Sequence, residues 1–451
     1  MFKQRFSYFV MAFAVVLSPA AAKAQSLVRD SEVEKLVRDY SDPLFVAAGL
    51  NPDDIKIYLV DDKEINAFVT DGQKMFVNAG TILEATSPNQ LKGVIAHETG
   101  HIAGGHLARS SQAEKEAMVP AYVTIALGIV AIAAGAPDAG AALLASSQQF
   151  AILSFYSYTR TQESSADQAA LQYLEKTHQS PQGLIDFFEK FRYQEVMSEA
   201  RRTEFFRSHP LSTDRIDALE RRAASSPYLK AVDSDSDKER LALAQAKLYG
   251  FLYTGQQVYV KYPFSDNSIP AQYARAIAYY RAPDLDLATD AVQKLINAEP
   301  NNPYFQELMG QIYFENGKSD KALPYYQKSV SLLPNDSLLR IGLARTYINL
   351  GTNEDLEKAE TELRNAVRLE DDNAFAWNQI AIVADKQGKD GLARLATAEE
   401  AFALGDYERA NRFAQAAMRK FDRHTPSWQR ASDIRSVTEE AAAKAAKANK
   451  Q

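Results

Sequence analysis

Apolar and polar positions change their spacing several times along the N-terminal part of the chain. Between residues 27 and 50, apolar side chains recur every three or four positions, which predicts a helix with one buried face. Residues 55–60 alternate and are rich in β-branched side chains, so they predict a strand. The runs 65–69 and 75–78 flank an Asp-Gly pair, which predicts a β-hairpin. A longer helical pattern begins near residue 89, after a Ser-Pro pair typical of a helix start.

A long stretch of low charge follows this helix. Residues 117–136 contain no charged side chain, and a second Ala-rich apolar run extends from there to residue 158. The first run has the length of a membrane span, which needs about 20 apolar residues. Its many Ala and Gly residues, and its place between the two motifs described below, favour instead a buried or interface-seeking helical hairpin over 117–158. A true span is the alternative, and contact with a membrane surface is compatible with the hairpin.

From about residue 270 the helical pattern repeats itself. The triplet Pro300-Asn301-Asn302 recurs at 334–336, and Gly317 recurs as Gly351, each 34 residues later. A helix-turn-helix unit of about 34 residues is typical of tetratricopeptide repeats. Such units bury their apolar faces by stacking, and the stack has a concave surface for partners. A plain helical bundle is the weaker alternative, because two markers share one period.

Composition and charge narrow the range of functions. The 451 residues predict two or three domains, and the hydrophobic content of 46% is sufficient for sizeable cores. The formal net charge of −7 gives no indication of nucleic-acid binding. Cysteine is absent, which excludes a thiol nucleophile, a Cys-ligated metal, disulfides and a lipidated N-terminal Cys.

The first residues have the pattern of a secretory signal peptide. Lys3 and Arg5 precede the apolar run 9–17, and the triplet Ala22-Lys23-Ala24 matches an A-x-A cleavage site before Gln25. The apolar run is short for a retained membrane anchor. We therefore expect an exported protein in the periplasm.

The sequence His97-Glu98-Thr99-Gly100-His101 is the strongest chemical motif in the chain. Residues four apart project from the same face of a helix, so His97 and His101 could hold one zinc ion. Glu98 could take a proton from a water molecule at that metal and pass it to a leaving amine. The motif is short, and it needs support from elsewhere in the chain.

Two acidic residues supply that support. Glu163 and Asp167 are also four apart, in Glu-Ser-Ser-Ala-Asp. Glu163 is the natural third protein ligand, which leaves one open position, as catalytic zinc requires. Asp167 fits an outer role in which it accepts the free ring N–H of a ligand histidine.

Two further histidines call for different interpretations. A metzincin site would need a histidine at position 107, where the chain has Leu107. If the helix continues, His106 faces away from His97, so we interpret His106 as structural. His209 stands in Ser-His-Pro-Leu-Ser-Thr, on a predicted turn before a helix. A loop histidine of this kind could occupy the open zinc position or donate a hydrogen bond to a developing oxyanion.

Together, the HETGHIAGGH, ESSAD and SHPLSTDRI motifs and the repeats resemble the BepA-type periplasmic metalloproteases, which are Ste24/HtpX-like peptidases. The resemblance covers residues 27–430. It implies that His97, His101 and Glu163 bind one Zn²⁺ and that Glu98 is the general base. It also implies that the loop histidine, His209, ligates the zinc and holds the enzyme in a self-inhibited state.

The same resemblance implies a biological setting. This family acts in quality control of outer-membrane β-barrel proteins and of the lipopolysaccharide-export machinery, and its repeat domain docks on the barrel-assembly machinery. Substrates of such proteases add a strand to a sheet edge beside the zinc. The predicted hairpin offers that edge, and we expect Asn66, Ala67 and Phe68 to line it.

We therefore expect an α+β, mostly α-helical protein, with a gluzincin-type zinc metalloprotease domain containing a small β-sheet and a tetratricopeptide-repeat solenoid. The expected parts are a signal peptide (1–24), the metalloprotease domain (25–225), a linker with connecting helices (226–269), the repeats (270–430) and a solvated tail (431–451). The expected function is that of a periplasmic zinc endopeptidase that degrades misassembled or unfolded exported proteins. The alternative is a repeat-based chaperone or adaptor with a structural or blocked zinc site.

Overall fold

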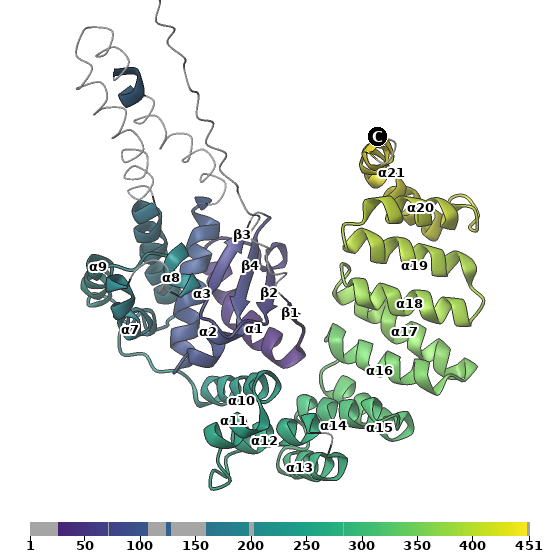
Figure 1. Ribbon diagram of the computed structural model, residues 1–451, viewed down its shortest axis with the longest axis horizontal. Helices are drawn as coiled ribbons and strands as arrows, with labels where there is room; N and C mark the ends of the chain where they lie inside the picture. Colours follow the sequence, from purple (N-terminus) through teal and green to yellow (C-terminus); the bar gives the residue numbers. More distant parts are fainter. Residues whose placement is uncertain are drawn as a thin grey trace, which may run out of the picture.

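The computed structural model describes residues 26–70, 72–106, 123–127, 159–197, 203–282 and 284–448 (Figure 1). The predicted signal peptide and most of the predicted apolar hairpin at 117–158 lie outside these residues. Within the described ranges, no helix combines the length and the apolar character that crossing a bilayer requires.

A small mixed sheet forms the β part of the N-terminal half. Its strands lie in the order β1 (Leu27–Val28), β2 (Lys56–Val60), β4 (Lys74–Asn78) and β3 (Ala67–Thr70). The β3 and β4 strands are antiparallel, with Thr70 opposite Lys74, so the predicted hairpin is confirmed. Its turn contains Gly72 and Gln73, which both have positive φ. The β2 strand runs parallel to β4, and β3 is left at the edge of the described sheet.

Helices cover this sheet. The first, α1 (Ser31–Ala47), begins after Asp30, whose side chain accepts a hydrogen bond from the Val33 backbone. The predicted start at residue 27 was wrong, because Leu27–Val28 pairs with β2 instead. A 3₁₀ turn, η1 (Pro52–Asp54), leads into β2, and α2 (Ala79–Glu84) follows β4. The α3 helix (Pro88–Ala103) begins close to the predicted position, with Ser87 as its N-cap.

Further helices complete the N-terminal core. They are a helix whose described part covers residues 159–176, α7 (Gln182–Lys190), η2 (Arg192–Val196), α8 (Glu204–Ser208) and α9 (Thr213–Ala223). One continuous apolar core joins these helices, apart from η2, to α1, the sheet and α3. Its phenylalanines come mainly from α7 and α8, where Phe187, Phe188, Phe205 and Phe206 are fully buried. The α3 helix lies inside this core, so the side chains that it presents are held rigidly.

The C-terminal half is a stack of antiparallel helix pairs. After α10 (Asp235–Leu252) and α11 (Gly255–Lys261) come α12 (Ile269–Arg281), α13 (Leu285–Ala298), α14 (Pro303–Glu315), α15 (Ser319–Leu332), α16 (Ser337–Leu350), α17 (Asn353–Leu369), α18 (Ala374–Lys386), α19 (Asp390–Ala403), α20 (Tyr407–Met418) and α21 (Pro426–Ala448). Gly317 and Gly351, the glycines that mark the repeat, both have positive φ at the turns between paired helices. The predicted helical repeat solenoid is therefore confirmed (Figure 1).

The end of the chain differs from its prediction. The α21 helix packs against α19 and α20, and Ala431, Ile434 and Thr438 are buried there. The prediction of a solvated tail from residue 431 was therefore wrong for this part, because apolar side chains at helical spacing cover the last repeat.

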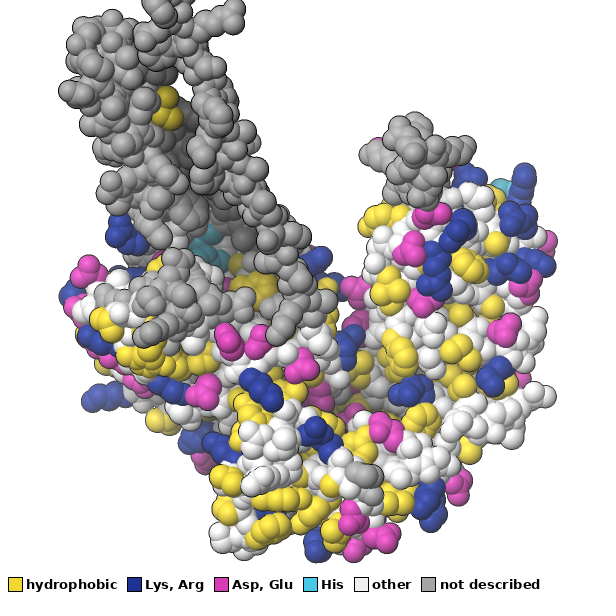
Figure 2. Space-filling view, in the orientation of Figure 1, with side chains coloured by type: hydrophobic (Ala, Val, Ile, Leu, Met, Phe, Trp, Pro, Cys, Tyr) yellow, Lys and Arg dark blue, Asp and Glu magenta, His cyan; other side chains and the backbone are white. Residues whose placement is uncertain are grey.

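Ion pairs link the N-terminal half to the repeats. Arg29 lies 2.7 Å from Glu370, and Lys56 lies 3.2 Å from Asp372. On the face shown in Figure 2, the molecule is hollowed between the N-terminal half and the far repeats. The repeat array therefore contacts the N-terminal half beside β1, at β2 and at α1, and a space remains between that half and the far repeats on the face shown in Figure 2.

Candidate metal centre

Two histidines from α3 form the base of the candidate site. His97 is fully buried and His101 nearly so, and their Nε2 atoms lie 3.2 Å apart. This closeness follows from the four-residue spacing on a continuous helix. The structure thus gives both rings the common direction that the sequence predicted for them.

The helix over residues 159–176 brings Glu163 to the same point. Its carboxylate oxygens lie 3.4 Å from Nε2 of His97 and 3.3 Å from Nε2 of His101. Close packing of this helix on α3 makes the approach possible. A Cβ atom on Gly100 would lie only 2.8 Å from the carbonyl oxygen of Ala166, so a larger residue at position 100 would force the helices apart.

His209, at the C-terminal end of α8, completes the cluster. Its Nδ1 lies 3.4 Å from Nε2 of His97 and 3.1 Å from a carboxylate oxygen of Glu163. One atom from each of His97, His101, Glu163 and His209 lies within 4.8 Å of all the others, and all four residues are buried.

The spacing of these atoms fits a tetrahedral metal. Ligand atoms about 2.0–2.2 Å from a zinc ion are about 3.3–3.6 Å apart in a tetrahedron. The contacts among the nitrogen and oxygen atoms of this cluster measure 3.1–3.4 Å. Two or three imidazoles with one carboxylate are also a donor set that zinc accepts.

Glu98 lies beside the cluster in an unusual state for a carboxylate. It is fully buried, and neither of its oxygens has a hydrogen-bond partner among the described residues. One oxygen lies 3.5 Å from Nε2 of His209. Burial raises the pKa of the Glu98 carboxyl, because the charged form is poorly solvated there. Burying a carboxylate without hydrogen-bond donors reduces the stability of the fold. Such carboxylates are found mainly at functional sites.

Asp167 and Arg215 support the cluster from outside. Asp167 lies 3.0 Å from Nδ1 of His97, the ring nitrogen on the side away from Glu163. Arg215 donates two hydrogen bonds of 2.8 Å to the Asp167 carboxylate. It also lies 3.1 Å from Glu163 and donates to the carbonyl of Pro210, the residue after His209.

Arg215 was not predicted as a site residue. Its guanidinium ties the His209 turn to the helix that presents Glu163 and Asp167. The clue in the sequence was the basic residue on the apolar face of a short helix, directly before Ile216, which is fully buried. Spacing alone does not distinguish such a residue from a surface arginine.

Burial and the charges of the site shift the pKa values of the two α3 histidines in opposite directions. Burial works against protonation of His97, but Asp167 and Glu163 raise its pKa to about 10. Burial lowers the pKa of His101 to about 3, and the nearby His97 cation acts in the same direction. Burial alone would raise the pKa of Glu163, but His209 and the other imidazoles hold it well below its usual range.

The overall charge also fits a cation. With the imidazoles neutral, as metal binding requires, the ionised carboxylates of Glu98, Glu163 and Asp167 outnumber the one guanidinium of Arg215 by two charges. This leaves two negative charges in a site from which water is largely excluded. A divalent metal at the centre of the cluster would balance them.

The prediction that His106 faces away from the site was wrong. The helix ends at Ala103, and the chain turns at Gly104 and Gly105, where φ is +60° at Gly105. His106 is thereby brought back to the site, with its Nδ1 3.0 Å from Nδ1 of His101. The prediction was wrong because it extended the helix beyond two glycines.

The predicted substrate edge lies beside α3. The Asn66 carbonyl accepts a hydrogen bond from the Asn78 backbone, and the Asn66 N–H donates to the Thr81 hydroxyl. Because backbone directions alternate along a strand, Phe68 also faces β4, whereas Ala67 and Val69 direct their backbone groups away from it. Of the three residues predicted to line the edge, only Ala67 therefore has backbone groups directed outward, where an added strand could pair with them.

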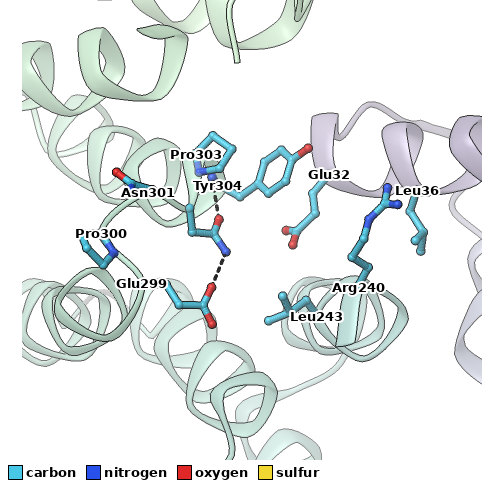
Figure 3. Close-up of a pocket in the computed structure, with 10 residues that line it drawn as sticks. Glu32, Leu36, Arg240, Leu243, Glu299, Pro300, Asn301, Pro303 and Tyr304 are labelled. Carbon is cyan, nitrogen blue, oxygen red and sulfur yellow. Dashed lines mark hydrogen bonds between the residues drawn. The ribbon is translucent and has the colours of Figure 1, made fainter. Parts of the chain in front are cut away.

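A cavity of about 410 Å³ lies apart from this cluster, where α1, α10 and the turn between α13 and α14 meet (Figure 3). Glu32, Arg240 and Tyr304 are among its lining residues. It contains none of the residues of the histidine cluster, and it marks the junction of the two halves of the chain.

Comparison with known proteins agrees with this geometry. The sequence model of peptidase family M48 matches residues 28–223. The beta-barrel assembly-enhancing protease of Escherichia coli (strain K12) is 28% identical over 332 residues, which are 72% of this chain and 66% of that protein. The protein of the same name from Yersinia pestis is 25% identical over 309 residues, which are 64% of this chain and 60% of that protein.

The matched regions thus span just under two thirds of the length of these relatives. Among solved structures, the crystal structure of MamA matches 38% of this chain and 96% of its own, at 19% identity and a TM-score of 0.28, which is too low to bear on the fold. Residues 28–223 contain the whole histidine cluster, Glu98 and all of the sheet except Leu27. They form a metallopeptidase domain of family M48, and the chain is a homologue of the beta-barrel assembly-enhancing proteases.

Proposed function

We propose that this protein is a zinc-dependent endopeptidase of the periplasm that cleaves misassembled or unfolded exported proteins. The observation that carries the proposal is the arrangement of His97, His101 and Glu163 around one point, 3.2–3.4 Å apart. Beside them lies the Glu98 carboxylate, which has no hydrogen-bond donor among the described residues. A structural metal site would have no use for a buried carboxylate that is not a ligand. A hydrolytic site requires such a group as its base.

Each residue then has a defined task. His97 and His101 offer their Nε2 atoms and Glu163 offers its carboxylate to the zinc, which when bound acts as a Lewis acid on the peptide carbonyl. Glu98, the proposed general base, takes a proton from the attacking water and returns it to the leaving amine. Asp167, fixed by Arg215, orients the ring of His97.

The proposed role of His209 is inhibitory: its ring blocks the site in the absence of substrate. Its ring lies against both the ligand atoms and Glu98, in the place that a substrate carbonyl and a water molecule need. The conformation described here is therefore a closed one, and substrate must displace the ring of His209.

The proposed substrate mode is strand addition at β3. Hydrogen bonding to the backbone of Ala67 and Val69 would not depend on the substrate's side chains. It would require an extended chain, which a misassembled exported protein offers and a closed barrel does not. This selects unfolded chains without selecting a sequence.

The location and partners follow from the N-terminal pattern and from the relatives. Residues 1–24 have the composition of a cleaved signal peptide. The relatives are named for enhancing beta-barrel assembly. We extend that setting to this chain, with unfolded outer-membrane proteins as substrates, the repeats as the docking surface for the barrel-assembly machinery, and peripheral membrane contact at 117–158.

The alternative, an adaptor with a blocked zinc site, is favoured by one observation, the position of His209 in the cluster. It predicts that neither the wild type nor His209→Ala cleaves any substrate, while both bind zinc and unfolded chains. An M48 domain in which Glu98 is present favours the peptidase instead.

The test compares the mature wild-type protein with Glu98→Gln and, as a control, Glu220→Gln on α9. We expect Glu98→Gln to retain its zinc and to lose about 10²–10⁴-fold in cleavage of a urea-unfolded outer-membrane barrel protein. Glu220→Gln should cleave like the wild type. Cleavage by Glu98→Gln at the wild-type rate would exclude Glu98 as the base.

A further inference from the structure

We infer that His106 is a positioning residue of the metal centre, which accepts the outer ring proton of His101 and fixes the tautomer in which Nε2 of His101 faces the metal. The inference rests on the proposed metal site and adds a residue to which we had first given only a structural role.

The contact between the two rings is well defined. His106 Nδ1 lies 3.0 Å from His101 Nδ1, and the rings meet edge to face with centroids 4.9 Å apart. Both side chains are buried, with 7% and 6% of the respective residues exposed. A nitrogen–nitrogen distance of 3.0 Å in a buried site requires one donor and one acceptor.

The opposite side of His101 decides which ring donates. Its Nε2 faces Nε2 of His97 at 3.2 Å and the Glu163 carboxylate at 3.3 Å. To bind a metal, this Nε2 must present a lone pair, so the proton of the neutral ring is on Nδ1. His101 therefore donates and His106 Nδ1 accepts, with the proton of His106 on its own Nε2.

This arrangement matches the one at the other ligand. His97 has an outer partner at its Nδ1, the Asp167 carboxylate, at 3.0 Å. Outer partners of this kind fix the orientation of ligand histidines and raise their basicity. With His106 included, both α3 ligands have one, the first an anion and the second a neutral ring.

The chain after α3 is shaped for this ring. A Cβ atom on Gly104 would lie 2.4 Å from Nε2 of His106 and under 3.0 Å from two of its ring carbons. Gly105 supplies the positive φ that reverses the chain. The Gln162 side chain donates to the His106 carbonyl at 3.2 Å, which ties the turn to the helix that holds Glu163.

The test measures zinc affinity, by competition with a chromophoric chelator, on the full mature protein. We expect His106→Ala to bind zinc about 10–100-fold more weakly. His106→Asn places an amide oxygen near the position of Nδ1 and should recover most of the affinity. Gly104→Ala should weaken binding although His106 is still present. His178→Asn, far from the cluster and tolerant of the positive φ at 178, is the control.

Two results would overturn the inference: wild-type affinity in His106→Ala, or no recovery in His106→Asn. If His106→Ala does not fold, His106→Leu, which fills the space without an acceptor, replaces it. These results are separable from the proposed function. A wild type that binds zinc but cleaves nothing contradicts the peptidase and leaves the ranking of affinities intact.

Discussion

At the scale of single residues, the proposal gives His209 control over whether the fourth zinc position is open to substrate. Its Nδ1 faces His97 and Glu163. Its Nε2 lies 3.5 Å from a Glu98 oxygen and has no hydrogen-bond partner in the part of the chain that the structure describes. The following residue is anchored, because Arg215 donates to the carbonyl of Pro210 at 2.8 Å. The turn is therefore fixed, and in the proposal substrate displaces the ring by rotation of the His209 side chain.

We predict that His209→Ala raises the cleavage of unfolded substrate several-fold and leaves the zinc content unchanged. The reason is that three protein ligands remain, while the ring that competes with substrate is gone. Initial rates with a fluorescent unfolded substrate measure the effect, with His178→Asn as the matched histidine control. Equal or slower cleavage by His209→Ala would show that the ring assists the reaction.

Local helix geometry explains which site residues could be predicted from the sequence. The spacing of His97 and His101, and of Glu163 and Asp167, gives each pair a common face on any helix. His106 and Arg215 act after a chain reversal or across helices, which spacing does not describe. The Gly104-Gly105 pair did indicate a helix end. It did not indicate that the next ring would turn back onto His101.

At the scale of elements, the β3 strand connects the fold to the proposed substrate mode. Its inner backbone groups pair with β4, and its outer groups, at Ala67 and Val69, run beside α3. Farther upstream, the carbonyl of Ile65 accepts a bond of 3.4 Å from the Phe205 backbone, so α8 covers that end. The stretch available for an added strand therefore begins at Ala67.

We predict that Val69→Pro lowers kcat/KM for unfolded substrate about tenfold or more, since one lost main-chain bond to substrate is worth about 1–1.5 kcal/mol and the proline ring obstructs pairing. The β3–β4 ladder should persist, because the lost N–H points away from β4. Val69→Ala, which keeps the N–H and removes the branched side chain, is the control. If both variants cleave equally well, substrate does not pair with this edge.

Secondary-structure elements could be predicted where a local sequence pattern is compatible with only one of helix, strand or turn. The hairpin had a turn sequence that permits positive φ, and the repeats had two markers at one period. Leu27–Val28 was assigned to a helix because its apolar residues suit either form. Pairing with β2, a tertiary contact, decides the outcome. The first turn of α1 is then set by the Asp30 cap.

At the scale of the whole molecule, a buried ionic cluster joins the peptidase half to the repeats. Lys247 of α10 lies 2.8 Å from Asp30 and 3.5 Å from Glu32, both at the start of α1, and 3.3 Å from Glu307 of α14. Tyr273 of α12 donates to Glu32 at 3.0 Å. The Glu32 carboxylate also borders the cavity shown in Figure 3. Orientation of the repeats therefore depends on these charges.

The cluster makes the joint sensitive to pH. Burial raises the pKa of Glu32 from its usual 4.5 to about 7; Asp30 and Glu307 act in the same direction, against Lys247 and Tyr273. The folded protein then holds a proton that the unfolded chain releases, so this group lowers stability as pH rises from about 4.5 to 7. A shift of this size corresponds to about 3 kcal/mol.

We predict that Glu32→Gln raises the melting temperature relative to wild type at pH 8 and leaves it unchanged at pH 4.5. The amide resembles the protonated acid, which is the form that predominates at the lower pH. Thermal unfolding at both pH values measures the effect, with Glu239→Gln, an exposed position on α10, as the control. A difference that is the same at both pH values would contradict the assignment.

The central claim is that one zinc ion, held by His97, His101 and Glu163, is required for cleavage. The most direct measurement is the zinc content and the cleavage of an unfolded outer-membrane protein, taken on the same mature sample before chelation, after chelation and after zinc is returned. We expect one zinc per chain, loss of zinc and cleavage together, and recovery of both with one equivalent. Cleavage that persists in the metal-free protein would contradict the account.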